Sequence, residues 1–295
     1  MKEQLVIGMG EALWDVLPSG KKMGGAPANF AYHVSQFGID SVAVSALGDD
    51  ELGAELLSEY AKVGLAVSME KLSYPTGTVQ VSVDERGIPS YDICQGVAWD
   101  NIALNDELKA LAQKATVVCF GSLAQRNKCS RDTINAFIDL MPDDEEHLKV
   151  FDINLRQSWY SKEVIENSLH KCNILKINDD ELVIVKELLD IQAEGQKAVC
   201  QALIDMYALR MVILTCGEKG SFVLAADGCE SWMDTPKVEV VDTVGAGDSF
   251  TGAFVASLLS GKSIRDAHKL AVDVSAYVCT QAGAMPVLPE ELKHL

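Results

Sequence analysis

The residues from Asp242 to Phe250 combine a turn of small residues with an acid at the start of an expected helix. They follow an apolar, strand-like run over 238–241 and lead into a helical pattern over 249–260. The unpaired N–H groups at a helix N-terminus favour an anion, and small side chains let that anion approach. Asp248 could then take a proton from a hydroxyl while the turn holds the acceptor group. The alternative for this turn alone is an Asp that caps a helix.

A second glycine-rich junction lies near the start of the chain, at Gly24-Gly25-Ala26-Pro27-Ala28-Asn29. Pro27 suits a first helical turn, and Asn29 offers a donor and an acceptor together, as a ligand with hydroxyl groups requires. Upstream, Asp15 lies in an alternating strand among apolar residues, where a carboxylate needs a bonding partner. The alternative for Asn29 is an exposed residue at a loop-to-helix junction.

Polar residues also follow three successive expected strands, over 152–156, 176–181 and 215–220. In a parallel sheet, ligands bind at the carboxyl ends of the strands, so these runs would face one site. Each run by itself would more often be solvated loop. Three in succession, together with the turn at 242–248, favour a binding site.

The spacing of the apolar runs predicts an α/β fold with a mostly parallel sheet and helices on both faces. Strands are expected at 4–9, 41–46, 116–120, 148–152, 173–177 and 210–215, and helices at 27–37, 51–63, 105–114, 130–140, 161–170, 178–189, 195–207, 249–260 and 263–280. Hairpins are expected from 78–83 with 90–94, through a turn at 85–89, and from 221–225 with 230–233. With a strand at 12–17, the first hairpin would form a small separate sheet that covers the site as a lid.

The composition excludes several classes of partner. A net charge of −18 argues against nucleic acid and anionic membrane, because both require basic patches. No apolar run approaches a membrane span, and the N-terminus lacks a signal pattern. The eight Cys are scattered without a CxxC pair, as expected of buried thiols in a reducing cytoplasm. We therefore expect a cytoplasmic protein, and 295 residues suit one large domain.

The two glycine-rich stretches resemble the two signatures of the ribokinase-like (PfkB-type) carbohydrate kinases. Gly24 to Asn29 is similar to the N-terminal sugar-binding signature, and Asp242 to Asp248 to the C-terminal catalytic signature. With the run from Gly10 to Asp15, the chain is most similar to bacterial fructokinases. The resemblance implies one ribokinase-like domain over 1–295, with a three-layer α/β/α core. A small β-sheet lid would be formed by segments at about 11–23 and 76–95, which are inserted in this core.

The resemblance also implies a role for each matching residue. The anion hole for the moving phosphoryl group would comprise Gly245, Ala246 and Gly247, with Asp248 as the catalytic base. The substrate side would comprise Asp15, Gly25, Asn29, Asn154 and Arg156. The ATP side would comprise Lys176, Asn178, Thr215, Gly217 and Gly220. Glu181 would organise Mg²⁺ through water, and Asp242 and the backbone of Val244 would form part of a site for K⁺. Ile153 and Cys216 depart from the family pattern without removing a functional group.

The expected reaction is transfer of the γ-phosphoryl group of ATP to a primary hydroxyl, converting D-fructose to D-fructose 6-phosphate. An ordinary Asp pKa near ~4 would leave Asp248 ionised at pH 7. Kinases of ribose or of 2-keto-3-deoxygluconate are alternatives, and a catalytically silent sugar-binding regulator is a more remote one. An open lid sheet leaves edges and apolar area, so a homodimer through the lid is a further expectation.

Overall fold

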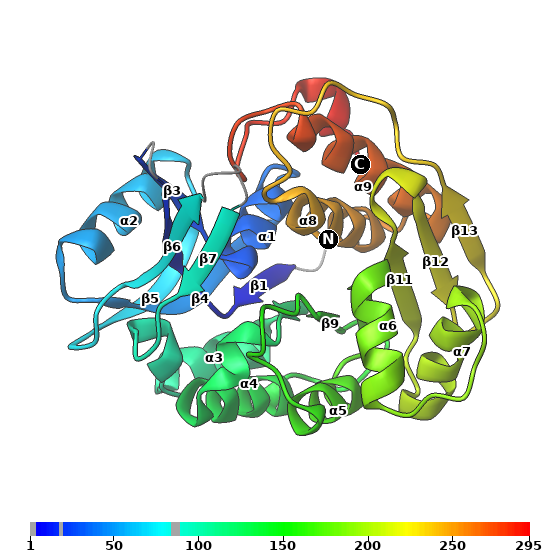
Figure 1. Ribbon diagram of the computed structural model, residues 1–295, viewed down its shortest axis with the longest axis horizontal. Helices are drawn as coiled ribbons and strands as arrows, with labels where there is room; N and C mark the ends of the chain where they lie inside the picture. The colour runs from blue at the N-terminus through cyan, green and yellow to red at the C-terminus, as the bar shows by residue number, and fades with distance from the viewer. Residues whose placement is uncertain (1–3, 18–19, 84–88) are drawn as a thin grey trace.

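The computed structural model describes residues 4–17, 20–83 and 89–295. Figure 1 shows a large twisted sheet between helices, with a second, smaller sheet beside the part of it that β1, β4 and β5 form. The predicted α/β class is confirmed, and the strand–helix alternation from residue 104 onward is the pattern that indicated it.

The main sheet has nine strands in the order β13-β12-β11-β10-β9-β8-β1-β4-β5. The strands from β11 to β5 pair in parallel, while β12 and β13 add an antiparallel hairpin at one edge. Their bounds are β1 Leu5–Met9, β4 Asp40–Gly48, β5 Ala66–Leu72, β8 Val117–Phe120, β9 Leu148–Asp152, β10 Ile174–Asn178, β11 Met211–Thr215, β12 Ser221–Ala225 and β13 Glu230–Met233.

Helices cover both faces of this sheet because successive strand residues point to opposite sides. On β10, for example, Ile174 packs into one apolar cluster with α1, α8 and α9, whereas Leu175 packs into another with α3 to α7. The helices are α1 Ala26–Ser35, α2 Glu51–Lys62, α3 Asp106–Lys114, α4 Lys128–Leu140, α5 Lys162–Lys171, α6 Asp179–Leu188, α7 Gln196–Tyr207, α8 Ala246–Leu259 and α9 Ile264–Cys279. This arrangement is the predicted three-layer core.

The small sheet has the order β3-β2-β6-β7, with β2 at Leu13–Leu17, β3 at Gly20–Gly24, β6 at Gly77–Val83 and β7 at Pro89–Ile93. Strands β6 and β7 pair antiparallel, as the hairpin prediction requires, and β2 joins β6 in parallel. Of the turn expected at 85–89, residues 85–88 lie outside the described residues. Strand β3, Gly-Lys-Lys-Met-Gly, carries no strand pattern of its own and forms by pairing with β2.

Two local predictions were wrong. The run at 238–241 is not a strand, because Val238, Val240 and Val241 are exposed at the surface and the segment pairs with no strand of the described chain. Helix α8 begins at Ala246 rather than 249, so part of the glycine turn is already helical. Strand β5 was also not foreseen. Within the described ranges, no helix has the length and apolarity needed to cross a membrane.

Candidate active site

The turn before α8 is held in a conformation that requires glycine. Gly245 is the N-cap residue with φ 78°, and a Cβ placed there would lie 2.7 Å from the Cβ of Ala284. Ala246 and Gly247 follow in the first helical turn, where N–H groups lack intrahelical acceptors. The N–H of Ala246 already donates to the carbonyl of Thr243 over 3.3 Å. The turn therefore presents the backbone edge expected of an anion hole, with one of its donors already engaged by the chain.

Asp248 lies directly behind this turn, and α1 supplies its nearest partner. Asn29 donates from Nδ2 to Oδ2 of Asp248 over 2.7 Å. Burial and the neighbouring charge of Asp152 raise the pKa of Asp248 to about 6, against the lowering effects of Asn29, Lys176 and Arg156. The ordinary pKa expected from the sequence is therefore wrong, although an Asp with this value is still mostly ionised at pH 7.

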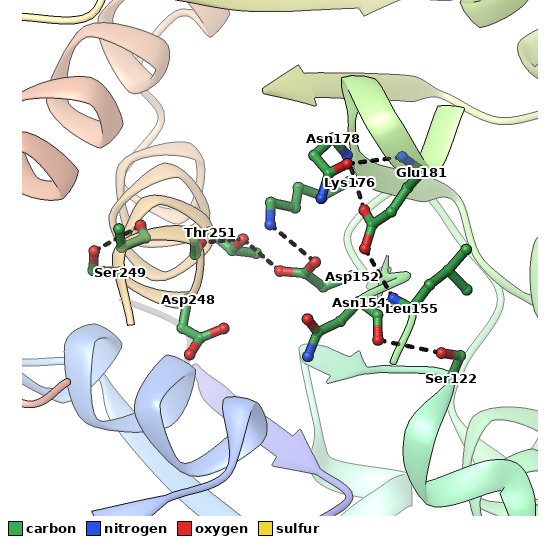
Figure 2. Close-up of polar contacts among 12 residues, drawn as sticks. Ser122, Asp152, Asn154, Leu155, Lys176, Asn178, Glu181, Asp248, Ser249 and Thr251 are labelled. Atoms are coloured by element: carbon green, nitrogen blue, oxygen red, sulfur yellow. Dashed lines mark hydrogen bonds and ion pairs between the residues drawn. The ribbon is translucent and has the colours of Figure 1, made fainter. Parts of the chain in front are cut away.

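Asp152, at the end of β9, joins the buried cation of Lys176 to Thr251 on helix α8 (Figure 2). It accepts from Lys176 Nζ over 3.1 Å and from the hydroxyl of Thr251 over 3.0 Å. Burial alone would lower the pKa of Lys176, but the carboxylates of Asp152, Glu181 and Asp248 outweigh it and raise that pKa. A Cβ on Gly247 would lie 2.8 Å from Lys176 Nζ, so the missing side chain lets the ammonium reach the anion-hole turn. The sequence analysis gave Asp152 no role of its own. Its position at the carboxyl end of a parallel strand was the feature that could have indicated one.

Asn178 and Glu181 form a capping box at the start of α6. The side chain of Asn178 accepts from the N–H of Glu181, and Glu181 accepts from the N–H groups of Asn178 and Leu155 at 2.9 and 2.8 Å. Burial raises the pKa of Glu181. Within the described part of the chain, no group of three or more His, Cys, Asp or Glu side chains could hold a metal by itself. Both Glu181 oxygens already accept one backbone N–H, and each keeps a second lone pair that could accept from the water shell of a cation.

The residues assigned to the substrate side come from three places in the fold. Asp15 lies on β2 of the small sheet, Gly25 caps α1, and Asn154 and Arg156 follow β9. Asn154 has φ 43°, a left-handed conformation that Asn tolerates better than most residues. The positive charge of Arg156 lowers the pKa of both Asp15 and Asp248, although burial raises each overall. Its guanidinium itself donates to the carbonyl of Leu155 over 3.2 Å.

Glu11, at the end of β1, is a buried acid of this side that sequence reasoning missed. The residue is 4% exposed, and its Oε1 accepts from the N–H of Ala26 over 3.3 Å. Burial raises its pKa to about 7, and the charge of Asp248 adds to that effect. The sequence did offer an indication, because an acid that follows an apolar strand is costly to bury unless it has a bonding partner.

The residues that the resemblance assigns to ATP lie at the ends of β10 and β11, where Asn178 is the register partner of Thr215. Gly217 and Gly220 adopt φ 55° and 129° in the following turn. A Cβ on Gly220 would lie 2.4 Å from the carbonyl oxygen of Met233, which excludes any side chain there.

Asp242 accepts from Lys22 Nζ on β3 over 3.0 Å, and from the N–H groups of Val244 and Gly283 over 3.1 and 3.2 Å. Burial alone would raise the pKa of Asp242, but these bonds outweigh it and lower that pKa. A residue of the small sheet thus contacts the turn at 242–248. Lys22 also places its positive charge at Asp242, the carboxylate that the resemblance assigns to a K⁺ site.

The sequence that forms this site matches a known family. The model for the pfkB family of carbohydrate kinases matches residues 18–291. The chain belongs to this family. It is therefore a carbohydrate kinase, as the two signatures predicted.

The names of similar proteins refer to more than one sugar substrate. The chain is 29% identical to an ATP-dependent 6-phosphofructokinase of Thermoanaerobacterium thermosaccharolyticum, covering 98% of this chain and 92% of that protein. It is also 29% identical to probable fructokinase-4 of Arabidopsis thaliana, with 98% and 95% covered. The structure of a fructokinase with bound ATP from Xylella fastidiosa superposes with a TM-score of 0.85 at 21% identity, covering 98% and 96% of the two chains. That superposition establishes the ribokinase-like fold.

Proposed function

We propose that this pfkB-family kinase transfers the γ-phosphoryl group of ATP to the primary hydroxyl of D-fructose, giving D-fructose 6-phosphate. The observation that carries the proposal is the placement of Asp248 between the Asn29 amide and the glycine turn, with the Lys176 ammonium on the far side of Gly247. Asp248 would accept the proton of the attacking hydroxyl, and the turn and Lys176 would neutralise charge on the moving phosphoryl group.

The charges on the substrate side support a neutral sugar. The acids Glu11, Asp15 and Asp248 face this side, and Arg156 is a cation that acts on all three. A sugar acid or a phosphorylated sugar would bring further negative charge next to these carboxyl groups, whereas hydroxyls can bond them in either protonation state. This favours fructose over 2-keto-3-deoxygluconate and over the fructose 6-phosphate that the name of one relative implies.

ATP would lie over the ends of β10 and β11, against Lys176, Asn178, Thr215, Gly217 and Gly220. Glu181 would hold the waters of a Mg²⁺ ion that arrives with ATP, and this ion supplies further neutralisation of phosphate charge. The small sheet would act as a lid, since it brings Asp15 to the substrate side and Lys22 to Asp242.

A homodimer through the lid remains a prediction. None of the large apolar side chains found exposed in the described residues lies on β2 or β3, so these strands offer little apolar contact area. Light scattering at working concentration would settle the oligomeric state.

The acceptor is tested by measuring kcat/KM with saturating ATP, through ADP release, for D-fructose, D-ribose, 2-keto-3-deoxygluconate and D-fructose 6-phosphate. We expect D-fructose to give the highest value. A higher value for another acceptor would overturn the proposal, and sugar binding without ADP release would revive the silent regulator.

A further inference from the structure

A small recess lies at the floor of the candidate site, below Asp248. Its walls come from the ends of β1, β8 and β9, from the first turn of α1 and from α8, and its polar lining comprises Glu11, Asp152, Asn154 and Asp248. The apolar part of the wall includes Pro27 and Phe120. The recess has a volume of about 10 Å³, which is about the space that one water molecule requires.

Glu11 has a spare oxygen beside this recess. Its Oε1 is engaged by the N–H of Ala26, but its Oε2 is fully buried and has no hydrogen-bond partner among the described residues. Burial of a carboxyl oxygen without a hydrogen-bond partner costs its hydration free energy, and no other bond offsets that cost. Such atoms in proteins are therefore usually bonded to an ordered water. The cavity size, the polar lining and the unpaired oxygen all indicate that one water molecule occupies the recess.

We propose that Glu11 is a positioning residue for Asp248 that acts through one water molecule bound in this recess. The water would donate to Oε2 of Glu11 and to the Asp248 carboxyl and accept from the Asn154 amide. When Glu11 is protonated and donates to the water, Asp152 could be the second acceptor instead. Asp248 would then be fixed from two sides, by the Asn29 amide at Oδ2 and by the water from below. The burial that raises the pKa of Glu11 to about 7 also means that this carboxyl can donate to the water or accept from it near neutral pH.

This inference rests on the proposed function only in its kinetic part, because the water can be observed without any turnover. A positioned base matters in the transition state, so loss of the water should lower kcat and leave the KM for ATP unchanged. A purely structural role of Glu11, through Ala26 and the start of α1, would instead reduce stability and disturb binding together.

Two variants of similar length separate these roles. Glu11→Gln keeps polar atoms for both Ala26 and the water, whereas Glu11→Met fills the same space without a hydrogen bond. Tyr60→Phe is the control, because the Tyr60 hydroxyl is another buried group without a described partner, its own pKa responds to the charge of Glu11, and it does not line the recess. Each variant would be examined by high-resolution crystallography, by thermal unfolding and by steady-state kinetics with ATP and the best sugar.

We expect an ordered water between Glu11 and Asp248 in the wild type and in Glu11→Gln, with kcat of the latter within about threefold. We expect Glu11→Met to lose the water and about tenfold in kcat, with the KM for ATP unchanged, and Tyr60→Phe to change neither. The proposal is overturned by an empty recess in the wild type, by full activity of Glu11→Met, or by a Tyr60→Phe variant that loses as much kcat as Glu11→Met. If the wild type phosphorylates no sugar, the proposed function fails, and the crystallographic comparison still decides whether the water is held by Glu11.

Discussion

Asn29 donates its side-chain amide to Oδ2 of Asp248 over 2.7 Å, so the first glycine-rich signature directly contacts the acid of the second. The two residues are 219 positions apart in the chain. The Oδ1 atom of Asn29 is buried and has no partner among the described residues. Asn29 therefore fixes one oxygen of the Asp248 carboxyl with one end of its amide, while the acceptor at the other end is left unused.

Asn29→Ala should raise the KM for the sugar much more than the KM for ATP, because Asn29 is assigned to the side away from the nucleotide loop. The lost hydrogen bond should cost about 0.5–1.5 kcal/mol, and more if a buried partner is stranded. The same bond lowers the pKa of Asp248, so the acid limb of the pH profile should also move to higher pH. Initial rates over both substrates test this, and an equal rise of the two KM values would contradict the assignment.

The pH dependence of kcat/KM follows from the state of Asp248, which acts as a base only when ionised. Since its pKa is raised to about 6, kcat/KM should be level above that value and fall as the pH drops through about 6. Glu11 titrates nearby, with a pKa raised to about 7, so the profile should be repeated in Glu11→Gln. A limb near pH 4 in both proteins would show that burial does not perturb Asp248.

Most of the fold could be predicted because its elements carry periodic apolar patterns of ordinary length. Strands such as β9 and β10 were placed within one residue, as were helices such as α3 and α7. The errors occur where the pattern does not decide the structure. Strand β3 exists only through its pairing with β2, and the valines of 238–241 have a strand composition but no neighbouring strand to pair with.

The candidate site was predicted less completely, because its contacts join segments that are distant in the sequence. The bond from Asn29 to Asp248 depends on the packing of α1 against α8, and the ion pair of Lys22 with Asp242 depends on the placement of the small sheet. The raised pKa of Asp248 depends on burial, which a motif cannot report. Glu11 was missed because it is a single acid after a strand, a pattern more often found in solvated loops. Asp152 was placed at the site within the polar run at 152–156 but was given no role of its own.

Gly247→Ala should impair catalysis by displacing the Lys176 ammonium, which lies 2.8 Å from where the new Cβ would be. We expect a fall of about tenfold in kcat/KM, since the cation is moved but not removed. The fold should survive, because the contacted atom is the end of a flexible side chain. A double-mutant cycle with Lys176→Met tests the cause. If the two losses simply add, the effect of Gly247→Ala does not pass through Lys176.

K⁺ should raise activity relative to Na⁺ or to no monovalent ion, if Asp242 and the backbone of Val244 form part of a cation site. A bound cation would stiffen the turn at 242–248 and orient its N–H groups. Because Lys22 already places a positive charge at Asp242, Lys22→Met should make the response to K⁺ larger. Rates measured from zero to saturating K⁺ in both proteins test this, and no response in either would rule out the site.

Asp248→Asn is the decisive test of the mechanism. Asn keeps the size of the side chain, and its oxygen can still accept from Asn29, so folding and sugar binding should largely persist. It cannot take the proton of the attacking hydroxyl, and removal of a general base typically lowers the rate by ~10²–10⁴. The loss should appear in kcat with little change in either KM, as expected for an interaction made mainly in the transition state.

The matched control for Asp248→Asn is Ser249→Ala, in the same helical turn, whose hydroxyl bonds only the carbonyl of Ala246 in the described structure. This control should retain kcat, and unfolding temperatures should show that both variants are folded. The raised pKa of Asp248 reflects an acid placed deep in the molecule beside Asp152. Its carboxyl accepts from the Asn29 amide, whereas a helix cap accepts from a backbone N–H of the first turn. Near wild-type kcat in Asp248→Asn would nevertheless show that Asp248 is such a cap and that another group, or no group, removes the proton.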